Sequence, residues 1–243
     1  MAEEAGAKAL FEKFGTYVLP GRVDDPRRAI DEAQEAERIG LGAVWISERF
    51  ALKEPAVLAG AVSEATSKIR INGTFYSTMR HPIVTASIAN LMQAMSGERF
   101  GIMFARAVPA YMKMLGAPAI TMERLADCIS IMRSLWKGET VDYEGVLGKF
   151  PMLKLTDMHK GKVPPIIFTA IGPKSLEFAG THCDGVLLHP FVSPQGVRNS
   201  ARIVREAGGV TFPLVTTCIP RATQSLHRPR QGWHPFSRAR SPR

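Results

Sequence analysis

Seven short apolar runs recur along the chain, and amphipathic stretches separate them. The runs occupy residues 14–21, 42–47, 68–77, 99–106, 164–170, 184–190 and 211–220. Runs such as "GAVWIS" and "PPIIFTA" are almost continuously apolar, which is typical of parallel strands buried on both faces. Strands that alternate with helices predict a parallel sheet covered by helices, so the pattern is that of an α/β protein.

The helical stretches carry their own start and stop signals. Apolar side chains in residues 121–138 recur at the spacing of one helix face, with Thr121 as a cap and Gly138 at the end. Pro82 and Gly97 mark the two ends of another helix. Residues 139–163 lack such a pattern, so we expect an irregular excursion there and not a linker between domains.

The strand count decides between two architectures. An open doubly wound sheet and a TIM-type (β/α)8 barrel both alternate strands with helices. Seven strands, with none left for a second domain, favour an incomplete barrel of about seven β/α units that lacks its last unit. We therefore predict one barrel domain over residues 1–220, and we expect exposed strand edges where the eighth strand is missing.

The positive charge of the chain is concentrated at its C-terminal end. The net charge is +9 over 243 residues, and residues 221–243 hold six arginines and no acid. This tail has no apolar periodicity, so we predict that it is disordered. It could be a natural tail, a basic arm for nucleic acid or anionic membrane, or an out-of-frame product. The abrupt change of character favours the out-of-frame reading, and we do not expect a nucleic-acid partner.

Several protein classes are excluded by composition. No apolar run approaches the roughly 20 residues that span a bilayer, and residues 1–15 lack the apolar core of a signal peptide. The three cysteines, Cys128, Cys183 and Cys218, have no CxxC spacing, which argues against a zinc site or a disulfide framework. We therefore expect a cytoplasmic protein with no membrane partner and no bound metal.

Four segments carry motifs in a fixed order: residues 40–50, 80–106, 122–145 and 164–188. They read "GLGAVWISERF", "RHPIVTASIANLMQAMSGERFGIMFAR", "MERLADCISIMRSLWKGETVDYEG" and "PPIIFTAIGPKSLEFAGTHCDGVLL". Together they resemble the luciferase-like monooxygenase superfamily and, within it, the branch of oxidoreductases that depend on coenzyme F420. The resemblance implies a TIM-type barrel, which agrees with the strand count.

The resemblance also implies an activity. It points to an F420-dependent oxidoreductase that transfers hydride between the deazaflavin and a small organic substrate, and to a homodimer. An FMN-dependent luciferase-like monooxygenase remains an alternative, because the motifs do not separate the two cofactors. An alternative of another class is a truncated or frameshifted barrel without independent catalysis.

The family places its cofactor ring across the C-terminal mouth of the barrel. A strained, often cis, peptide at the end of the third strand supports the ring there. The matching positions in this chain are Asn72, Gly73 and Thr74. Arg106, after the fourth strand, is a further basic residue that we expect to bind the cofactor.

The stretch after the fifth strand, "TAIGPKSLEF", can be interpreted in two ways. A glycine between a strand and a helix either cradles an anion or simply allows the turn. The resemblance favours cofactor contact, with Ala170, Ile171 and Gly172 close to the ring and Lys174 and Ser175 as anion contacts.

Candidate catalytic residues follow the second and sixth strands. Many F420-dependent relatives carry an acid followed by histidine after strand two, where this chain has Glu48 and Arg49. Glu48 keeps the acidic group and is predicted to be catalytic. Arg49 cannot exchange protons near neutral pH, so we expect it to bind an anionic substrate. His189 ends strand six and is the other predicted acid or base.

Overall fold

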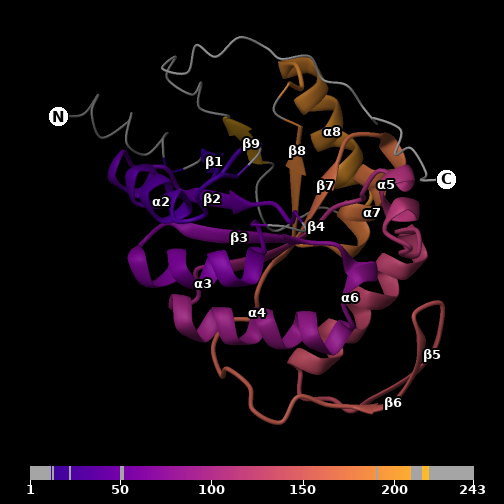
Figure 1. Cartoon of the computed structure of the whole chain (residues 1–243). Coiled ribbons are helices and arrows are strands. Elements are labelled where there is room, and N and C mark those ends of the chain that lie inside the picture. Colours follow the sequence, from indigo (N-terminus) through magenta and orange to yellow (C-terminus); the bar gives the residue numbers. More distant parts are fainter. Residues whose placement is uncertain are drawn as a thin grey trace, which may run out of the picture.

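The computed structural model describes residue 12, residues 14–21, 23–49, 52–189 and 191–208, and the backbone of residues 215–218. These residues form strands surrounded by helices, with a hairpin projecting from one side (Figure 1). The predicted tail, residues 221–243, lies outside the described residues.

Seven parallel strands form a closed ring in the order β1-β2-β3-β4-β7-β8-β9. They are β1 (Gly15–Tyr17), β2 (Ala43–Ile46), β3 (Arg70–Phe75), β4 (Phe100–Phe104), β7 (Ile166–Ala170), β8 (Gly185–Leu188) and β9 (Val215–Cys218). The predicted incomplete TIM-type barrel is thereby confirmed. The expected exposed edges are not found in the described strands, because β9 pairs with both β8 and β1.

Helices cover the outside of the strands (Figure 1). They are α2 (Arg28–Arg38), α3 (Pro55–Ala65), α4 (Pro82–Ser96), α5 (Pro109–Met114), α6 (Met122–Trp136), α7 (Pro173–His182) and α8 (Pro194–Glu206), with a 3-10 turn η1 (Ser77–Met79) before α4. Side chains of Glu54, Thr121 and Ser193 cap α3, α6 and α8 by accepting from backbone N–H groups. Short α5 was not predicted.

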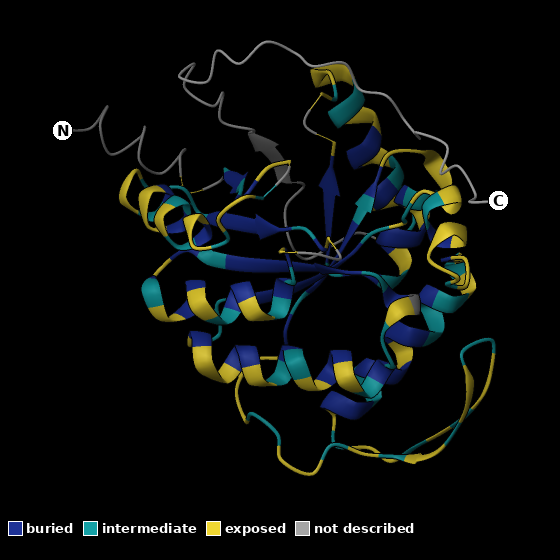
Figure 2. Cartoon of the chain, in the orientation of Figure 1, coloured by how far each residue is buried: buried dark blue, intermediate teal, exposed yellow. Residues whose placement is uncertain are grey.

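Two apolar layers hold the barrel. Outward-facing strand residues such as Phe100, Ile102 and Phe104 pack under the helices, whose inner faces are buried (Figure 2). Inward-facing residues, including Trp45 and Met103, fill the interior of the ring. A Cβ atom on Gly15 would lie 2.5 Å from Nε1 of Trp45, so this glycine makes room for the indole.

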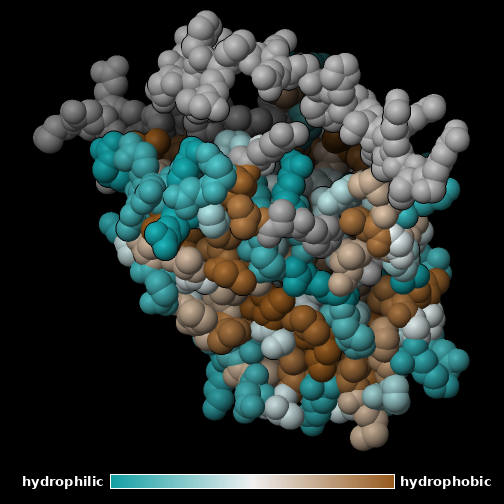
Figure 3. Space-filling view, in the orientation of Figure 1, coloured by the Kyte–Doolittle hydropathy of each residue, from teal (hydrophilic) through white to brown (hydrophobic). Residues whose placement is uncertain are grey.

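The outer face of α4 is unusually apolar. None of its fifteen residues is charged, and Val84, Leu91 and Met95 are exposed. Figure 3 shows the resulting apolar patch over α3 and α4.

The expectation of an irregular segment over residues 139–163 is wrong in part. An antiparallel hairpin forms there from β5 (Val141–Gly145) and β6 (Gly148–Leu153). In β5 the half-buried Val141 and Tyr143 alternate with the exposed Asp142 and Glu144, but this alternation is too short to have predicted a strand. It is held by Tyr143, which stacks on Phe150 at 5.6 Å and donates its hydroxyl to Asp127 at 2.5 Å.

Candidate functional site

A cavity of about 340 Å³, called the mouth cavity below, opens at the C-terminal ends of the strands. Its walls come from β1, β7, β8, the β4–α5 loop and the first turn of α7. The lining residues are Tyr17, Arg106, Ala107, Pro109, Thr169, Ala170, Ile171, Gly172, Ser175, Leu187, Leu188 and His189. Active sites of TIM-type barrels lie at this end of the strands.

The structure brings half of the predicted site residues together around this cavity: Arg106, Ala170, Ile171, Gly172, Ser175 and His189. Lys174 is exposed and does not line it. Tyr17 was missed, although its place at the end of the first strand, in "FGTYVLP", was a usable signal. Burial raises the pKa of Tyr17, so its hydroxyl stays protonated at neutral pH.

Gly172 forms the rim of the cavity at the start of α7. Its backbone is extended, with φ −90° and ψ 161°, and a Cβ atom there would meet no atom within 4 Å. Neither the turn nor the packing therefore requires glycine at this position. In the first turn of α7, Pro173 has no N–H, and the N–H groups of Ser175 and Leu176 donate to the carbonyl of Gly172 at 3.0 Å each, so the N–H groups that a ligand could meet at this rim are those of Gly172 and Lys174.

His189 follows β8 and is exposed to the cavity. Its Nδ1 accepts a hydrogen bond from the backbone N–H of Phe191 at 3.4 Å, and the two rings lie 5.2 Å apart. An accepting Nδ1 favours the neutral tautomer that carries its proton on Nε2. This arrangement leaves Nε2 as the atom that can exchange a proton with a bound molecule.

The mouth cavity favours negative charge. Arg106 is a permanent cation in its wall, and no carboxylate occurs among the described lining residues. A cleft lined by one sign of charge raises the local concentration of molecules of the opposite sign.

Glu48 does not line the mouth cavity. It follows the C-terminal end of β2 and is buried, with 3% of its surface exposed. Its Oε1 accepts from Nε and Nη2 of Arg80 at 3.2 and 2.5 Å, and its Oε2 accepts from the N–H of Tyr76 at 2.6 Å. Arg80 also pairs with Glu54 at 2.6 Å. Both carboxylate oxygens are thus engaged, and Glu48 anchors the β3–α4 loop. Its catalytic role stays a prediction, as does substrate binding by Arg49, which is exposed.

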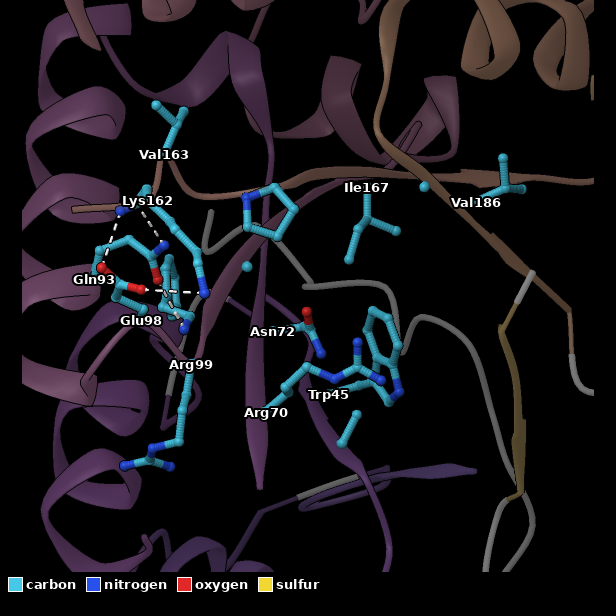
Figure 4. A pocket seen from close by; sticks show the side chains of 15 residues that line it. Trp45, Arg70, Asn72, Gln93, Glu98, Arg99, Lys162, Val163, Ile167 and Val186 are labelled. Atoms are coloured by element: carbon cyan, nitrogen blue, oxygen red, sulfur yellow. Dashed lines mark hydrogen bonds and ion pairs between the residues drawn. The ribbon is translucent and has the colours of Figure 1, made fainter. Parts of the chain in front are cut away.

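Asn72, Gly73 and Thr74 lie within β3 and not after it, because the strand continues to Phe75. Asn72 donates to the carbonyl of Val44 at 3.4 Å and points toward the N-terminal end of the barrel (Figure 4). Thr74 is buried, and its hydroxyl has no hydrogen-bond partner within the described part of the chain. None of the described peptide bonds is cis.

We expect Glu48→Gln to lower the free energy of unfolding by about 2 kcal/mol, because an amide NH₂ would then face Arg80 or the N–H of Tyr76 inside the protein. Urea denaturation measures the change. Glu139→Gln, the same substitution at an exposed glutamate, should change the free energy of unfolding by less than about 0.5 kcal/mol. Equal effects of the two substitutions would contradict the anchoring role.

The described residues offer neither a metal site nor a thiolate at neutral pH. They contain no group of three or more His, Cys, Asp or Glu side chains that could hold a metal ion. Cys128 and Cys183 are free and buried, and burial raises the pKa of each thiol to about 12. No helix in this part of the chain is long and apolar enough to cross a bilayer.

Comparison with known proteins identifies the family. A model of the luciferase-like monooxygenase family matches residues 4–231. The chain belongs to the luciferase-like monooxygenase family. Among curated family relatives, an F420-dependent glucose-6-phosphate dehydrogenase of Amycolatopsis mediterranei is 27% identical over 206 residues, which cover 76% of this chain and 56% of the relative. A 5,10-methylenetetrahydromethanopterin reductase of Methanolobus tindarius is 27% identical over 203 residues, covering 80% and 60%.

Solved structures agree on the fold. An F420-dependent secondary alcohol dehydrogenase in complex with an F420–acetone adduct has a TM-score of 0.70 and 22% identity, covering 81% of this chain and 65% of that one. The oxygenating constituent of 3,6-diketocamphane monooxygenase from Pseudomonas putida, in complex with FMN, has a TM-score of 0.69 and 20% identity, covering 83% and 64%. The chain spans a little over half the length of these curated relatives and less than two thirds of these structures.

Proposed function

We propose that the chain is an F420-dependent oxidoreductase that transfers hydride between the deazaflavin and a small organic substrate at the mouth cavity. The observation that carries the proposal is Gly172, whose missing side chain leaves open space where no turn or contact demands a glycine. Membership of the luciferase-like family and the F420-dependent relatives support the choice of reaction.

The residues around the mouth cavity fit such a cofactor. Its volume lies within the range of ligand pockets, roughly 300–1,000 Å³. Ala170, Ile171 and Gly172 would contact the ring, and Ser175, Lys174 and Arg106 would hold anionic groups. The cofactor supplies hydride transfer when bound, while the protein positions it and controls nearby protons.

One side chain of the mouth cavity would act on protons in this site. His189 would donate or accept a proton through Nε2, which its contact with Phe191 leaves available. Thr74 is buried and does not line the mouth cavity, so the contact of β3 with the cofactor stays a prediction. Asn72 faces the other end of the barrel, so we assign it no contact with the ring.

The alternative cofactor is FMN, because a structure in complex with FMN matches the fold as well as one that holds F420. Equilibrium titration with each cofactor, followed by absorbance, decides between them. We expect the lower Kd for F420, because it carries a longer anionic tail to meet Arg106 and Lys174. A lower Kd for FMN would reverse the order, and binding of neither would favour a barrel without independent catalysis.

Replacing Gly172 by leucine should raise the Kd of the cofactor at least about tenfold, since the side chain would occupy the open space at the rim. The fold should tolerate the change because φ is −90°, a value that leucine adopts readily. Gly60→Leu on α3 is the matched control, because a Cβ atom there also meets no atom within 4 Å. An unchanged Kd in Gly172→Leu would show that the cofactor does not bind against this rim.

A further inference from the structure

The connections that follow the C-terminal ends of the strands carry exposed apolar side chains. Five consecutive strands of the ring, β2, β3, β4, β7 and β8, are each followed by a connection that exposes a large hydrophobic residue. We call these residues the apolar rim; they are Leu52, Met79, Val108, Ile171 and Phe191. All five lie at the same end of the barrel as the mouth cavity, because the C-terminal ends of parallel strands meet there. The described connections at the opposite end expose two such residues, Ile39 and Val163.

Three members of the apolar rim stand close to one opening. Val108 is 68% exposed, Ile171 71% and Phe191 82%. Ile171 lines the mouth cavity, and Val108 lies between two residues that line it. The ring of Phe191 lies 5.2 Å from that of His189, which also lines the cavity. Single exposed apolar side chains are common on protein surfaces, whereas a group of them at one site marks an interaction surface.

The charges on the same side of the barrel favour an anionic partner. Three exposed cations, called the rim cations below, follow β2, β4 and β7 and form no ion pair within the described part of the chain: Arg49, Arg106 and Lys174. The described residues of the five connections include two carboxylates, Glu48 and Glu54. Both pair with Arg80, at 2.5 and 2.6 Å. The charge that remains available at this end is therefore positive.

We propose that the C-terminal end of the barrel binds the surface of an anionic lipid bilayer. The apolar rim enters the interface between headgroups and acyl chains, and the rim cations contact the phosphates of the headgroups. Binding of this kind combines buried apolar area with electrostatic attraction, and it needs no segment that spans the bilayer. The sequence predicted no membrane partner because it lacks a spanning segment, so that expectation does not bear on a surface contact.

A fluid bilayer suits this end of the barrel better than the groove of a protein partner. The apolar side chains stand on five separate connections and share this end with the rim cations, and mobile lipids can adapt to each of them. Each cation near an anionic leaflet strengthens binding about fivefold, which is about 1 kcal/mol. The proposal is independent of the proposed oxidoreductase activity, because lipid binding is measured without cofactor.

Co-sedimentation of the full chain with sucrose-loaded vesicles tests the proposal. We expect saturable binding to vesicles of POPC and POPG in a ratio of about 7:3, and binding at least about tenfold weaker to POPC alone. The double variant Arg49→Gln, Lys174→Gln should bind the anionic vesicles at least about tenfold more weakly. Lys137→Gln, Lys160→Gln, which removes two exposed charges elsewhere, should weaken binding less than about threefold.

A second pair of double variants tests the apolar contribution. Val108→Ser, Phe191→Ser should weaken binding to the anionic vesicles at least about tenfold, because serine removes apolar area that the interface would bury. Leu91→Ser, Met95→Ser is the matched control on the exposed face of α4, and it should leave the affinity within about twofold.

Tryptophan fluorescence provides a readout that does not depend on loss of binding. In Phe191→Trp, brominated lipid should quench the added indole, whereas Leu91→Trp should be quenched no more than the wild type. The proposal is overturned if the wild type does not bind, if the α4 double variant loses binding, or if Phe191→Trp is not quenched. An unchanged affinity in either rim double variant also overturns it and would point instead to the six arginines of residues 221–243.

Discussion

Replacing His189 by glutamine should lower kcat about 100-fold, while the Kd of the cofactor changes less than about twofold. The imidazole lies in the wall of the mouth cavity, and its Nδ1 contact with Phe191 leaves Nε2 to exchange a proton. Glutamine keeps a hydrogen-bonding side chain of similar reach but cannot exchange a proton near neutral pH. Single-turnover kinetics with preloaded cofactor separate the chemical step from binding.

The pH dependence of kcat identifies the role of the imidazole. If His189 exchanges a proton in the chemical step, the pH profile of kcat should lose one limb in His189→Gln. His182→Gln is the matched control, because His182 packs on Phe178 at the far end of α7 and does not line the mouth cavity. A fall in kcat with an unchanged pH profile would mean that His189 only packs in the site. Failure of the wild type to bind the cofactor would instead count against the proposed function itself.

The fold could be predicted because its signals are local and repeated. The run "GAVWIS" contains β2, and Pro82 and Gly97 mark the two ends of α4 as expected. The β5–β6 hairpin was not predicted because the apolar alternation in β5 is short, and because its contacts with Asp127 and with the hydrophobic core form only in the folded chain. Closure of the ring was not predicted, because the number of strands alone does not show that β9 can pair with β1.

The candidate site was predictable only where the chain itself marks a strand end. Gly172 and His189 directly follow apolar runs, so their place at the mouth could be inferred. The environment of Glu48 could not be inferred from the sequence, because Arg80 lies 32 residues later and reaches Glu48 only in the folded barrel. The same holds for Asn72, whose direction depends on which face of β3 points inward.

A buried lysine beside the first loop of the barrel is expected to make stability depend on pH. Lys53 is 2% exposed, and its Nζ donates to the carbonyl of Leu19 at 2.5 Å. Glu32 accepts from the N–H of the same Leu19 at 2.7 Å, so two side chains hold a leucine whose φ is +50°. Burial first, and then repulsion from Arg49, lower the pKa of Lys53 from 10.5 to about 8, against a smaller opposing effect of Glu32.

The sign of the effect follows from proton counting. Between about pH 8 and 10.5 the unfolded chain holds a proton on Lys53 that the folded chain has released, so stability rises with pH in this window. The full difference, about 2.5 pKa units, corresponds to about 3.5 kcal/mol at about 1.4 kcal/mol per unit. Below pH 8 both states are protonated, and the contribution of this lysine is constant. The neutral amine still donates to Leu19, so the hydrogen bond survives deprotonation.

Urea denaturation of the wild type and Lys53→Met between pH 7 and pH 10 tests this linkage, because the difference between their free energies of unfolding cancels groups common to both, including the tyrosines. The difference should be flat up to about pH 8 and should then shift in favour of the wild type as the pH rises. Lys160→Met, the same substitution at an exposed lysine, should show no such shift. A flat difference for Lys53→Met up to pH 10 would mean that the folded protein keeps this ammonium charged, with Glu32 as its counter-ion through the Leu19 peptide.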